Sequence, residues 1–283
     1  MSRPPTFTPP PCAYATTLST DRGDFAAVDA RPEGRPPRAT VLMLPGYTGS
    51  KEDFIALHEP LAAAGYRSVA VDGRGQYESE GPAGDEGPYA QGELAGDVLA
   101  QAAALGGGRP VHLLGHSLGG QIARAAVLAD PSPFRSLTLM SSGPAQISPA
   151  QQQRVKLLLD ALAVMDMAQV WEAIQALDAP EETATDEELR SRWLRHNPSQ
   201  LTATGRQLMS EPDRVAELAR VPLPVHVLSG VRDDTWPVEL FDEMALRLGA
   251  ARSVIADAEH SPNTDQPERT AAALIAFWDR LES

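Results

Sequence analysis

Short apolar segments alternate with helical segments along much of the chain. Apolar runs bounded by turn residues occur at 40–44 and 111–114, and such runs are typical of strands buried on both faces of a sheet. Between them, Phe54, Leu57 and Leu61 recur at helical spacing and predict one apolar helix face. The alternation predicts an α/β fold, with a mostly parallel central sheet covered by helices on both faces.

The other elements follow from the same reasoning. Further strands are expected at 13–18, 24–29, 68–71, 136–140, 225–228 and 252–256, and further helices at 91–105, 118–128 and 267–281. Ser50, with the acidic Asp53 three residues later, has the pattern of a helix start and predicts the beginning of the helix that contains Phe54.

The alternation is interrupted once, between residues 145 and 220. Apolar residues in this stretch recur at helical spacings, and no strand-like run occurs in it. We therefore expect residues 145–220 to form a helical cap (lid) inserted into an α/β core made of residues 13–144 and 221–283. Residues 1–12 are rich in proline and predict an irregular arm.

Composition narrows the classes of function. The chain has 283 residues, enough for one large domain, and a formal net charge of −14. This charge argues against nucleic acid and anionic membrane surfaces as partners, because both are bound through Lys and Arg. A small-molecule substrate remains as the expected partner, and the oligomeric state is left open.

Targeting signals and cysteine chemistry are also constrained by the sequence. Cys12 is the single cysteine, so no disulfide can form within the chain. The start of the chain carries no apolar segment typical of a signal peptide, and no run approaches the 18 apolar residues of a membrane span. These features predict a cytoplasmic protein.

Ser117 lies in the pattern G-x-S-x-G, formed by Gly115-His116-Ser117-Leu118-Gly119. A strand is expected just before it and a helix just after it, which is the context of a nucleophile elbow. The sharp turn requires small neighbours, because strand and helix almost touch there. It also places the amide of Leu118 at a helix N-terminus, where this amide can stabilise an oxyanion.

A serine nucleophile needs a general base, and His260 is the best candidate among six histidines. It follows the last expected strand, on a loop at the carboxyl edge of the sheet, where ligands bind in α/β folds. His112 and His226 fall inside strands, and we expect a solvated side chain for His196 in the cap. His112 and His116 are about 13 Å apart on a strand, so they cannot share a metal ion; no metal or cofactor is expected.

The acid that orients the base is expected on the loop after strand 225–228, where Asp233 and Asp234 are adjacent. The order along the chain is then Ser, Asp, His, which is the order of the α/β hydrolases. Asp234 is expected to be partly solvated or to cap the helix that begins near Trp236.

These motifs together resemble the α/β-hydrolase fold family over nearly the whole chain. Leu44-Pro45-Gly46-Tyr47 is similar to the family's H-G-x turn, with Pro45 at the usual His, and the resemblance implies that the amide of Tyr47 is a second oxyanion donor. Asp72-Gly73-Arg74-Gly75 is similar to the family's D-x-R-G loop. The family commonly has another Gly two residues later, where this chain has Tyr77. The spacing from Gly230 to Asp233 and Pro237 implies that Asp233 is the acid of the triad.

The sequence thus predicts a serine esterase that forms an acyl-enzyme on Ser117 and cleaves a carboxylic ester, thioester or lactone. Leu157, Trp171, Trp193 and Trp236 are candidates for the substrate pocket, although apolar residues of the cap can equally form its own core. The same triad can serve C–C bond hydrolysis, cofactor-free oxidation or lyase chemistry, and a non-catalytic binding protein on this fold is a further alternative.

Overall fold

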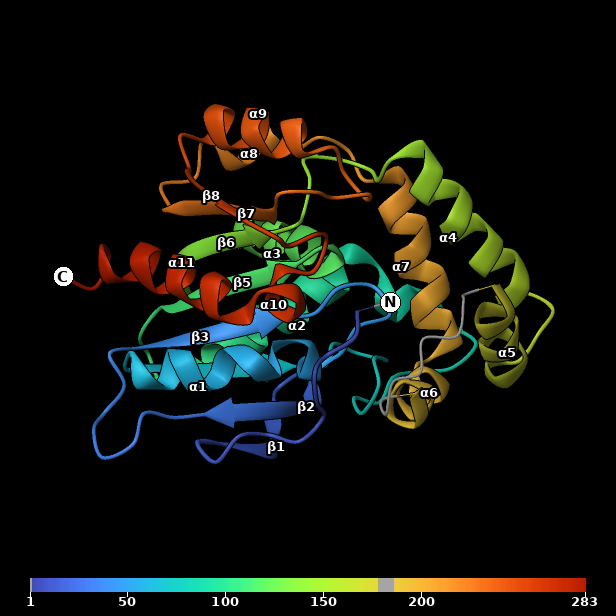
Figure 1. The fold of residues 1–283 in the computed structure, drawn as a ribbon, viewed down its shortest axis with the longest axis horizontal. Coiled ribbons are helices and arrows are strands. Elements are labelled where there is room, and N and C mark those ends of the chain that lie inside the picture. The colour runs from blue at the N-terminus through green and yellow to red at the C-terminus, as the bar shows by residue number, and fades with distance from the viewer. Residues whose placement is uncertain (1, 178–185) are drawn as a thin grey trace.

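The computed structural model describes residues 2–177 and 186–283, and its centre is an eight-stranded β-sheet (Figure 1). The strands are β1 (Ala13–Thr20), β2 (Gly23–Ala30), β3 (Ala39–Leu44), β4 (Tyr66–Val71), β5 (Val111–His116), β6 (Phe134–Met140), β7 (Val225–Gly230) and β8 (Ala251–Ile255). The sheet is the one that the apolar runs predict, with ends that differ by one to a few residues.

The strand order in the sheet is β1-β2-β4-β3-β5-β6-β7-β8. β1 and β2 pair antiparallel, and so do β2 and β4, whereas the pairs from β4 to β8 are parallel. The carboxyl ends of β3, β5, β6, β7 and β8 consequently meet at one edge of the sheet. Loops that are far apart in the sequence converge there, which is where ligands bind in sheets of this kind.

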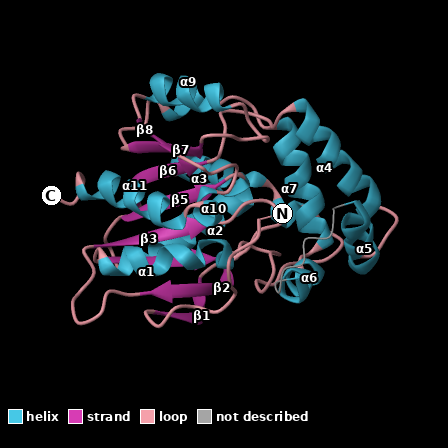
Figure 2. Ribbon diagram, viewed as in Figure 1, coloured by secondary structure: helices cyan, strands magenta, loops and turns pink. Residues whose placement is uncertain are grey.

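Helices cover both faces of the sheet (Figure 2). One face carries α1 (Ile55–Ala63), α10 (Pro262–Asp265) and α11 (Pro267–Asp279); the other carries α2 (Gln91–Gly106), α3 (Leu118–Ala129) and α9 (Val238–Leu248). Two short 3₁₀ helices are Lys51–Phe54, which follows Ser50 and leads directly into α1, and Gly87–Tyr89. Apolar side chains of the strands alternate between the two layers: Val41 and Met43 pack toward α1 and α11, and Leu42 and Leu44 pack toward α2 and α3.

In the described part of the stretch between β6 and β7, all regular elements are helices. It contains α4 (Pro149–Leu162), α5 (Met167–Leu177), α6 (Asp186–Arg195), α7 (Pro198–Ser210) and α8 (Val215–Leu218). Helices α4 to α7 lie beyond the carboxyl edge of the sheet, to the right in Figure 1, whereas α8 packs against α3 and α9 of the core. We call residues 145–210 the cap below.

The cap has a small apolar core of its own. Val170, Trp171, Leu189, Trp193 and Leu201 are buried together, and Trp193 donates a hydrogen bond from Nε1 to the carbonyl oxygen of Met167 at 2.7 Å. Trp171 and Trp193 therefore help to hold α5, α6 and α7 together. Among the described residues, no helix is both long and apolar enough to cross a membrane.

Candidate active site

Ser117 occupies a strained turn between β5 and α3. Its backbone angles are φ 53° and ψ −116°, a conformation that non-glycine residues rarely adopt and that is typical of functional sites. Leu118 is the first residue of α3, so its N–H belongs to the group of first-turn amides without a partner inside the helix.

The glycines of this turn have the steric role that the sequence predicts. A Cβ on Gly115 would overlap the carbonyl oxygen of Gly119, and a Cβ on Gly119 would overlap that of Leu44 at the end of β3. Gly120 faces the side chain of Ser142 in the same way. Only residues without a side chain fit here, because strand, helix and the loop after β3 meet within van der Waals distance.

Three predicted site residues converge at the carboxyl edge of the sheet. Oγ of Ser117 lies 3.1 Å from Nε2 of His260, on the loop after β8. Nδ1 of His260 lies 3.0 and 2.9 Å from the two carboxylate oxygens of Asp233, on the loop after β7. With Nδ1 donating to the carboxylate, Nε2 of the neutral ring is free to accept the Ser117 proton.

The Asp233 side chain is fully buried and held from two sides. Its Oδ1 accepts hydrogen bonds from the backbone N–H groups of Thr235 at 2.8 Å and Trp236 at 3.1 Å. These donors fix the carboxylate in front of His260. The expectation that Asp234 caps the following helix is wrong, because these two amides bind Asp233 and α9 begins only at Val238, after Pro237.

Asp234 instead contacts the cap. Its Oδ2 lies 2.6 Å from Nε2 of Gln151 and 3.1 Å from Nη1 of Arg154, both on α4. Its side chain is 64% exposed, in agreement with the predicted partial solvation. Asp233 and Asp234 thus point to different partners, as expected of adjacent residues on an extended loop.

His116 lies beside the proposed triad, in the wall of the same cavity as Ser117. Its Nε2 donates a hydrogen bond to the backbone carbonyl of His260 at 2.9 Å. Burial, together with the nearby His260 ring, lowers the pKa of His116 to about 4, so the ring is neutral at pH 7. The residue supports the loop that carries His260.

The remaining histidines are buried. His58, His112 and His226 each lie within 2.9 Å of a serine hydroxyl, on Ser68, Ser136 and Ser253 respectively, as expected of packed structural residues. His196, for which a solvated side chain was the expectation, is only 2% exposed. Its ring is enclosed between the cap and the loop after β3, a placement that helical spacing alone does not reveal.

The loop after β3 faces Ser117. A Cβ on Gly46 would lie 3.3 Å from Cβ of Ser117, so its backbone is in direct contact with the nucleophile elbow. The carbonyl of Gly46 accepts a hydrogen bond from Nε2 of Gln76 at 3.0 Å, and Thr48 has a positive φ of 59°. Tyr47 follows Gly46 and lines the same cavity as Ser117 and His260. We call residues 46–50 the oxyanion loop, after the role that the sequence predicts for the amide of Tyr47.

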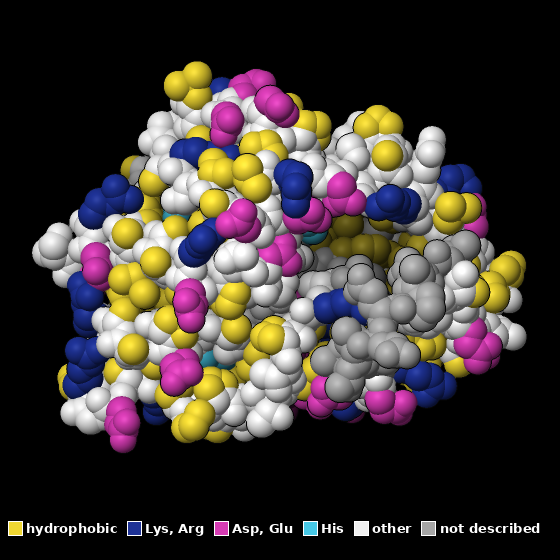
Figure 3. All heavy atoms as spheres, in the orientation of Figure 1, with side chains coloured by type: hydrophobic (Ala, Val, Ile, Leu, Met, Phe, Trp, Pro, Cys, Tyr) yellow, Lys and Arg dark blue, Asp and Glu magenta, His cyan; other side chains and the backbone are white. Residues whose placement is uncertain are grey.

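A cavity of about 770 Å³ lies between the core and the cap, with Ser117 and His260 in its wall. Figure 3 shows hydrophobic side chains gathered in a hollow in this region. Most of the lining is apolar, and it includes Ile147, Val155, Leu158, Val170, Ile174 and Leu208. Such a volume and lining suit a small ligand with a substantial apolar part.

The predicted pocket residues divide into two groups. Leu157, Trp171 and Trp193 line the cavity, although the two tryptophans also belong to the cap's own core. Trp236 is not among the described lining residues and the prediction for it is wrong. Its ring packs against Gly143, and its Nε1 donates to the backbone carbonyls of Ala145 and Gln146.

The N-terminal arm also reaches the cavity, which the sequence did not predict. Ser2 and Arg3, in the proline-rich arm, reach the cavity wall. Proline content marks such an arm as irregular but carries no information on where it docks. Among the described residues, no group of three or more His, Cys, Asp or Glu side chains is arranged to hold a metal ion.

Comparison with known proteins finds hydrolases among the relatives of this chain. The chain is 31% identical over 179 residues, 60% of its length and 70% of the relative's, to a pimeloyl-(acyl-carrier protein) methyl ester esterase of Methylococcus capsulatus. It is 32% identical over 213 residues, 70% of its length and 71% of the relative's, to a 2-hydroxy-6-oxononadienedioate/2-hydroxy-6-oxononatrienedioate hydrolase of Paraburkholderia xenovorans.

Among solved structures, a thermophilic esterase from Thermogutta terrifontis superimposes with a TM-score of 0.76 at 22% identity, covering 96% of this chain and all of the other. That likeness shows the fold. Residues 41–273 match the sequence pattern of the alpha/beta hydrolase family. With a match over this length, the chain belongs to the alpha/beta hydrolase family.

Proposed function

We propose that this protein is a serine hydrolase that cleaves a carboxylic ester through an acyl-enzyme on Ser117. The observation that carries the proposal is the continuous contact from Asp233 through His260 to Ser117, with distances of 2.9 and 3.1 Å. A nucleophile, a base and an orienting acid at hydrogen-bonding distance are the parts that acyl transfer requires.

The chemistry follows from these contacts. Oγ of Ser117 attacks the ester carbonyl carbon while Nε2 of His260 takes the hydroxyl proton, and Asp233 stabilises the imidazolium that forms. The amides of Tyr47 and Leu118 would hold the negative carbonyl oxygen of the tetrahedral intermediate. His260 then gives its proton to the departing alcohol. A water molecule, deprotonated by His260, releases the carboxylic acid and restores Ser117.

The cavity suggests the kind of acyl group. Its apolar walls favour an acyl chain without charge close to the reacting carbonyl, because burying an unpaired charge there is costly. Arg3 and Arg154 also line it, and Arg154 is paired with Asp234. Thioester and lactone substrates would use the same catalytic groups.

A second candidate is hydrolysis of a carbon–carbon bond, favoured by the similarity to the Paraburkholderia relative. The substrate in that relative's name contains no ester, so its hydrolysis breaks a C–C bond. The substrate is also a dicarboxylate, which needs cationic partners. Among the described lining residues only Arg3 and Arg154 carry a positive charge, and Arg154 is paired with Asp234. The otherwise mostly apolar lining therefore favours the ester reaction for this chain.

The experiment is a series of p-nitrophenyl esters and acyl thioesters of increasing chain length, with dienedioates as the competing class. Fluorophosphonate labelling followed by peptide mass spectrometry identifies the nucleophile, and Ser117→Ala is the matched control. Ester turnover with the label on Ser117 supports the proposal. Turnover of dienedioates without ester turnover would replace it with the second candidate, and absence of both turnover and labelling would refute both.

A further inference from the structure

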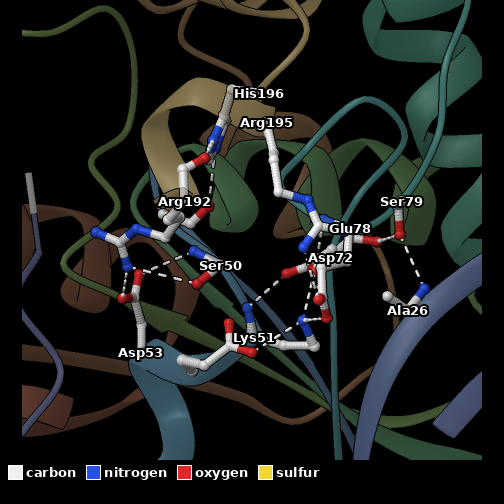
Figure 4. Close-up of polar contacts among 12 residues, drawn as sticks. Ala26, Ser50, Lys51, Asp53, Asp72, Glu78, Ser79, Arg192, Arg195 and His196 are labelled. Atoms are coloured by element: carbon white, nitrogen blue, oxygen red, sulfur yellow. Dashed lines mark hydrogen bonds and ion pairs between the residues drawn. The ribbon is translucent and has the colours of Figure 1, made fainter. Parts of the chain in front are cut away.

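The cap reaches into the core directly behind the oxyanion loop. Arg192 on α6 places Nη1 at 2.8 Å from Oδ1 of Asp53 and 3.4 Å from Oγ of Ser50, as Figure 4 shows. Both side chains of the Arg192–Asp53 pair are fully buried. Asp53 in turn accepts a hydrogen bond from the backbone N–H of Ser50 at 3.3 Å. The ion pair therefore joins a cap helix to the end of the oxyanion loop.

A second contact connects the same parts of the chain. The ring nitrogens of His196, just after α6, lie 2.9 Å from the carbonyl oxygen of Arg192 and 3.1 Å from that of Gly49 (Figure 4). Burial lowers the pKa of His196 to about 4, so the neutral ring has one N–H to donate. The ring fills the space between Arg192 and the oxyanion loop, whichever carbonyl receives that proton.

The cap also holds the side chain next to the proposed oxyanion donor. The hydroxyl of Tyr47 donates a hydrogen bond to the carbonyl oxygen of Leu201 on α7, at 2.9 Å. From the core side, the loop is held by Gln76 at Gly46 and by Asp72, which accepts from the backbone N–H of Lys51 at 2.7 Å. Contacts from the core and contacts from the cap thus both hold the loop in place.

These contacts matter for catalysis because the backbone of the loop is strained. Thr48 has a positive φ, and a non-glycine residue keeps this conformation only where its surroundings impose it. Oxyanion donors act only within a narrow range of distances from the charged oxygen, so a small shift of the loop reduces transition-state stabilisation. A fully buried ion pair such as Arg192–Asp53 adds less to the free energy of unfolding than a well-packed apolar contact would. Its hydrogen bonds are directional, so they fix the position of α6 relative to the loop.

We propose that Arg192 of the cap is a positioning residue that holds the oxyanion loop in its active geometry through Asp53 and Ser50. On this inference, which rests on the proposed function, the cap both encloses the substrate and completes the hydrolytic machinery of the core. Arg192 is not among the described residues that line the substrate cavity, so it would act through the residues it holds. Besides Asp53 and Ser50, it binds the carbonyl oxygen of Ser2 in the arm through Nη2 at 2.6 Å.

The test replaces Arg192 by methionine, which keeps much of the length of the side chain and removes its charge. The readouts are kcat and KM for the best ester substrate, and the inhibition constants of a trifluoromethyl ketone and the matching methyl ketone. The trifluoromethyl ketone adds to the serine and forms an oxyanion, whereas the methyl ketone reports binding without that charge. We expect kcat to fall by about 10- to 100-fold and the trifluoromethyl ketone to weaken in proportion, with KM and methyl ketone binding nearly unchanged.

Two further variants serve as a control and as a conservative substitution. Arg206→Met removes another cap arginine, whose pair with Glu86 is exposed, and should leave all four quantities unchanged. Arg192→Lys keeps the charge but has a single donor group in place of the guanidinium fork, and it should give an intermediate loss. If Arg192→Met does not fold, as shown by its circular dichroism spectrum, the lysine variant decides the question.

The outcomes separate this inference from the proposed function. A lower melting temperature with an unchanged ratio of the two ketone inhibition constants would show a purely structural role and overturn the inference. So would unchanged kinetics in a folded Arg192 variant, while ester turnover by the parent protein would leave the proposed function standing. A parent protein without ester turnover and without fluorophosphonate labelling would overturn both.

Discussion

Asp234 and Arg154 form an ion pair between the loop after β7 and cap helix α4, with Oδ2 and Nη1 3.1 Å apart. The neighbouring Asp233 is buried and faces His260 instead. Both members of the Asp234–Arg154 pair are mostly exposed, and exposed pairs contribute little to stability. The two adjacent aspartates therefore have different consequences when their charges are removed.

Asp233→Asn should lower kcat for ester hydrolysis on the order of 10⁴-fold. The imidazolium of His260 would lose the carboxylate that stabilises it, and the neutral ring would no longer be held in the tautomer that accepts the Ser117 proton. Asp234→Asn should change kcat little. Steady-state kinetics and melting curves of the two variants, measured side by side, check this. A large rate loss confined to Asp234→Asn would assign the orienting role to that residue.

Ser117→Ala should keep the fold and lose nearly all ester turnover. The remaining rate would be lower than that of the parent by about 10³-fold or more, since the oxyanion donors and the cavity are still present. Turnover, labelling by a fluorophosphonate and the melting temperature provide the measurements. Parent-like turnover by a folded Ser117→Ala protein would contradict the proposed mechanism.

The cavity predicts a change in acyl-chain preference. Leu158 lines the cavity from α4, so Leu158→Trp should fill part of it and move the preferred p-nitrophenyl ester toward shorter chains. Leu246→Trp, at an exposed position on α9, serves as the control and should leave the preference unchanged. An unchanged preference in Leu158→Trp would place the acyl group elsewhere.

The buried histidines predict how stability depends on pH. Burial lowers the pKa of His226 from 6.5 to about 4, with a smaller contribution from nearby arginines. Between these values the unfolded chain binds a proton that the folded protein does not, so this residue's contribution makes the free energy of unfolding fall as pH drops from about 6.5 to about 4. Above pH 6.5 the contribution is constant.

His226→Gln isolates this contribution. The slope of the free energy of unfolding against pH is measured by urea denaturation between pH 4.5 and 8. Below pH 6.5 it should be smaller in the variant than in the parent, by an amount that corresponds to the binding of up to about one proton. The two slopes should agree at pH 7 and above. Identical slopes throughout the range would contradict a neutral, buried His226.

The strands and the nucleophile elbow could be predicted because their signals are local. Apolar runs, the glycines around Ser117 and the loops after the last two strands each occupy a few consecutive residues, and parallel pairing brings those loops to one edge. The sequence therefore brought Ser117, Asp233 and His260 into one hypothesis, and the structure places them within hydrogen-bonding distance.

The errors concern contacts between distant segments. Trp236 was predicted to line the pocket, but its ring packs against Gly143. His196 was predicted to be solvated, but its ring lies against the backbone of Gly49. Residues 49 and 196 are separated by most of the core and the cap. Helical spacing predicts which residues share a face of α6, but the partner of that face depends on how the whole cap docks on the core.

The sequence by itself determined the order of strands and helices, the place of the helical insertion and the chemical groups at the sheet edge, because each depends on residues close together in the chain. Only the tertiary structure decided which cap residues line the cavity, that Ser2 and Arg3 of the arm reach it, and that Arg192 meets Asp53. These depend on the relative orientation of packed elements, which is set by the packing of many side chains at once and leaves no periodic trace in the sequence.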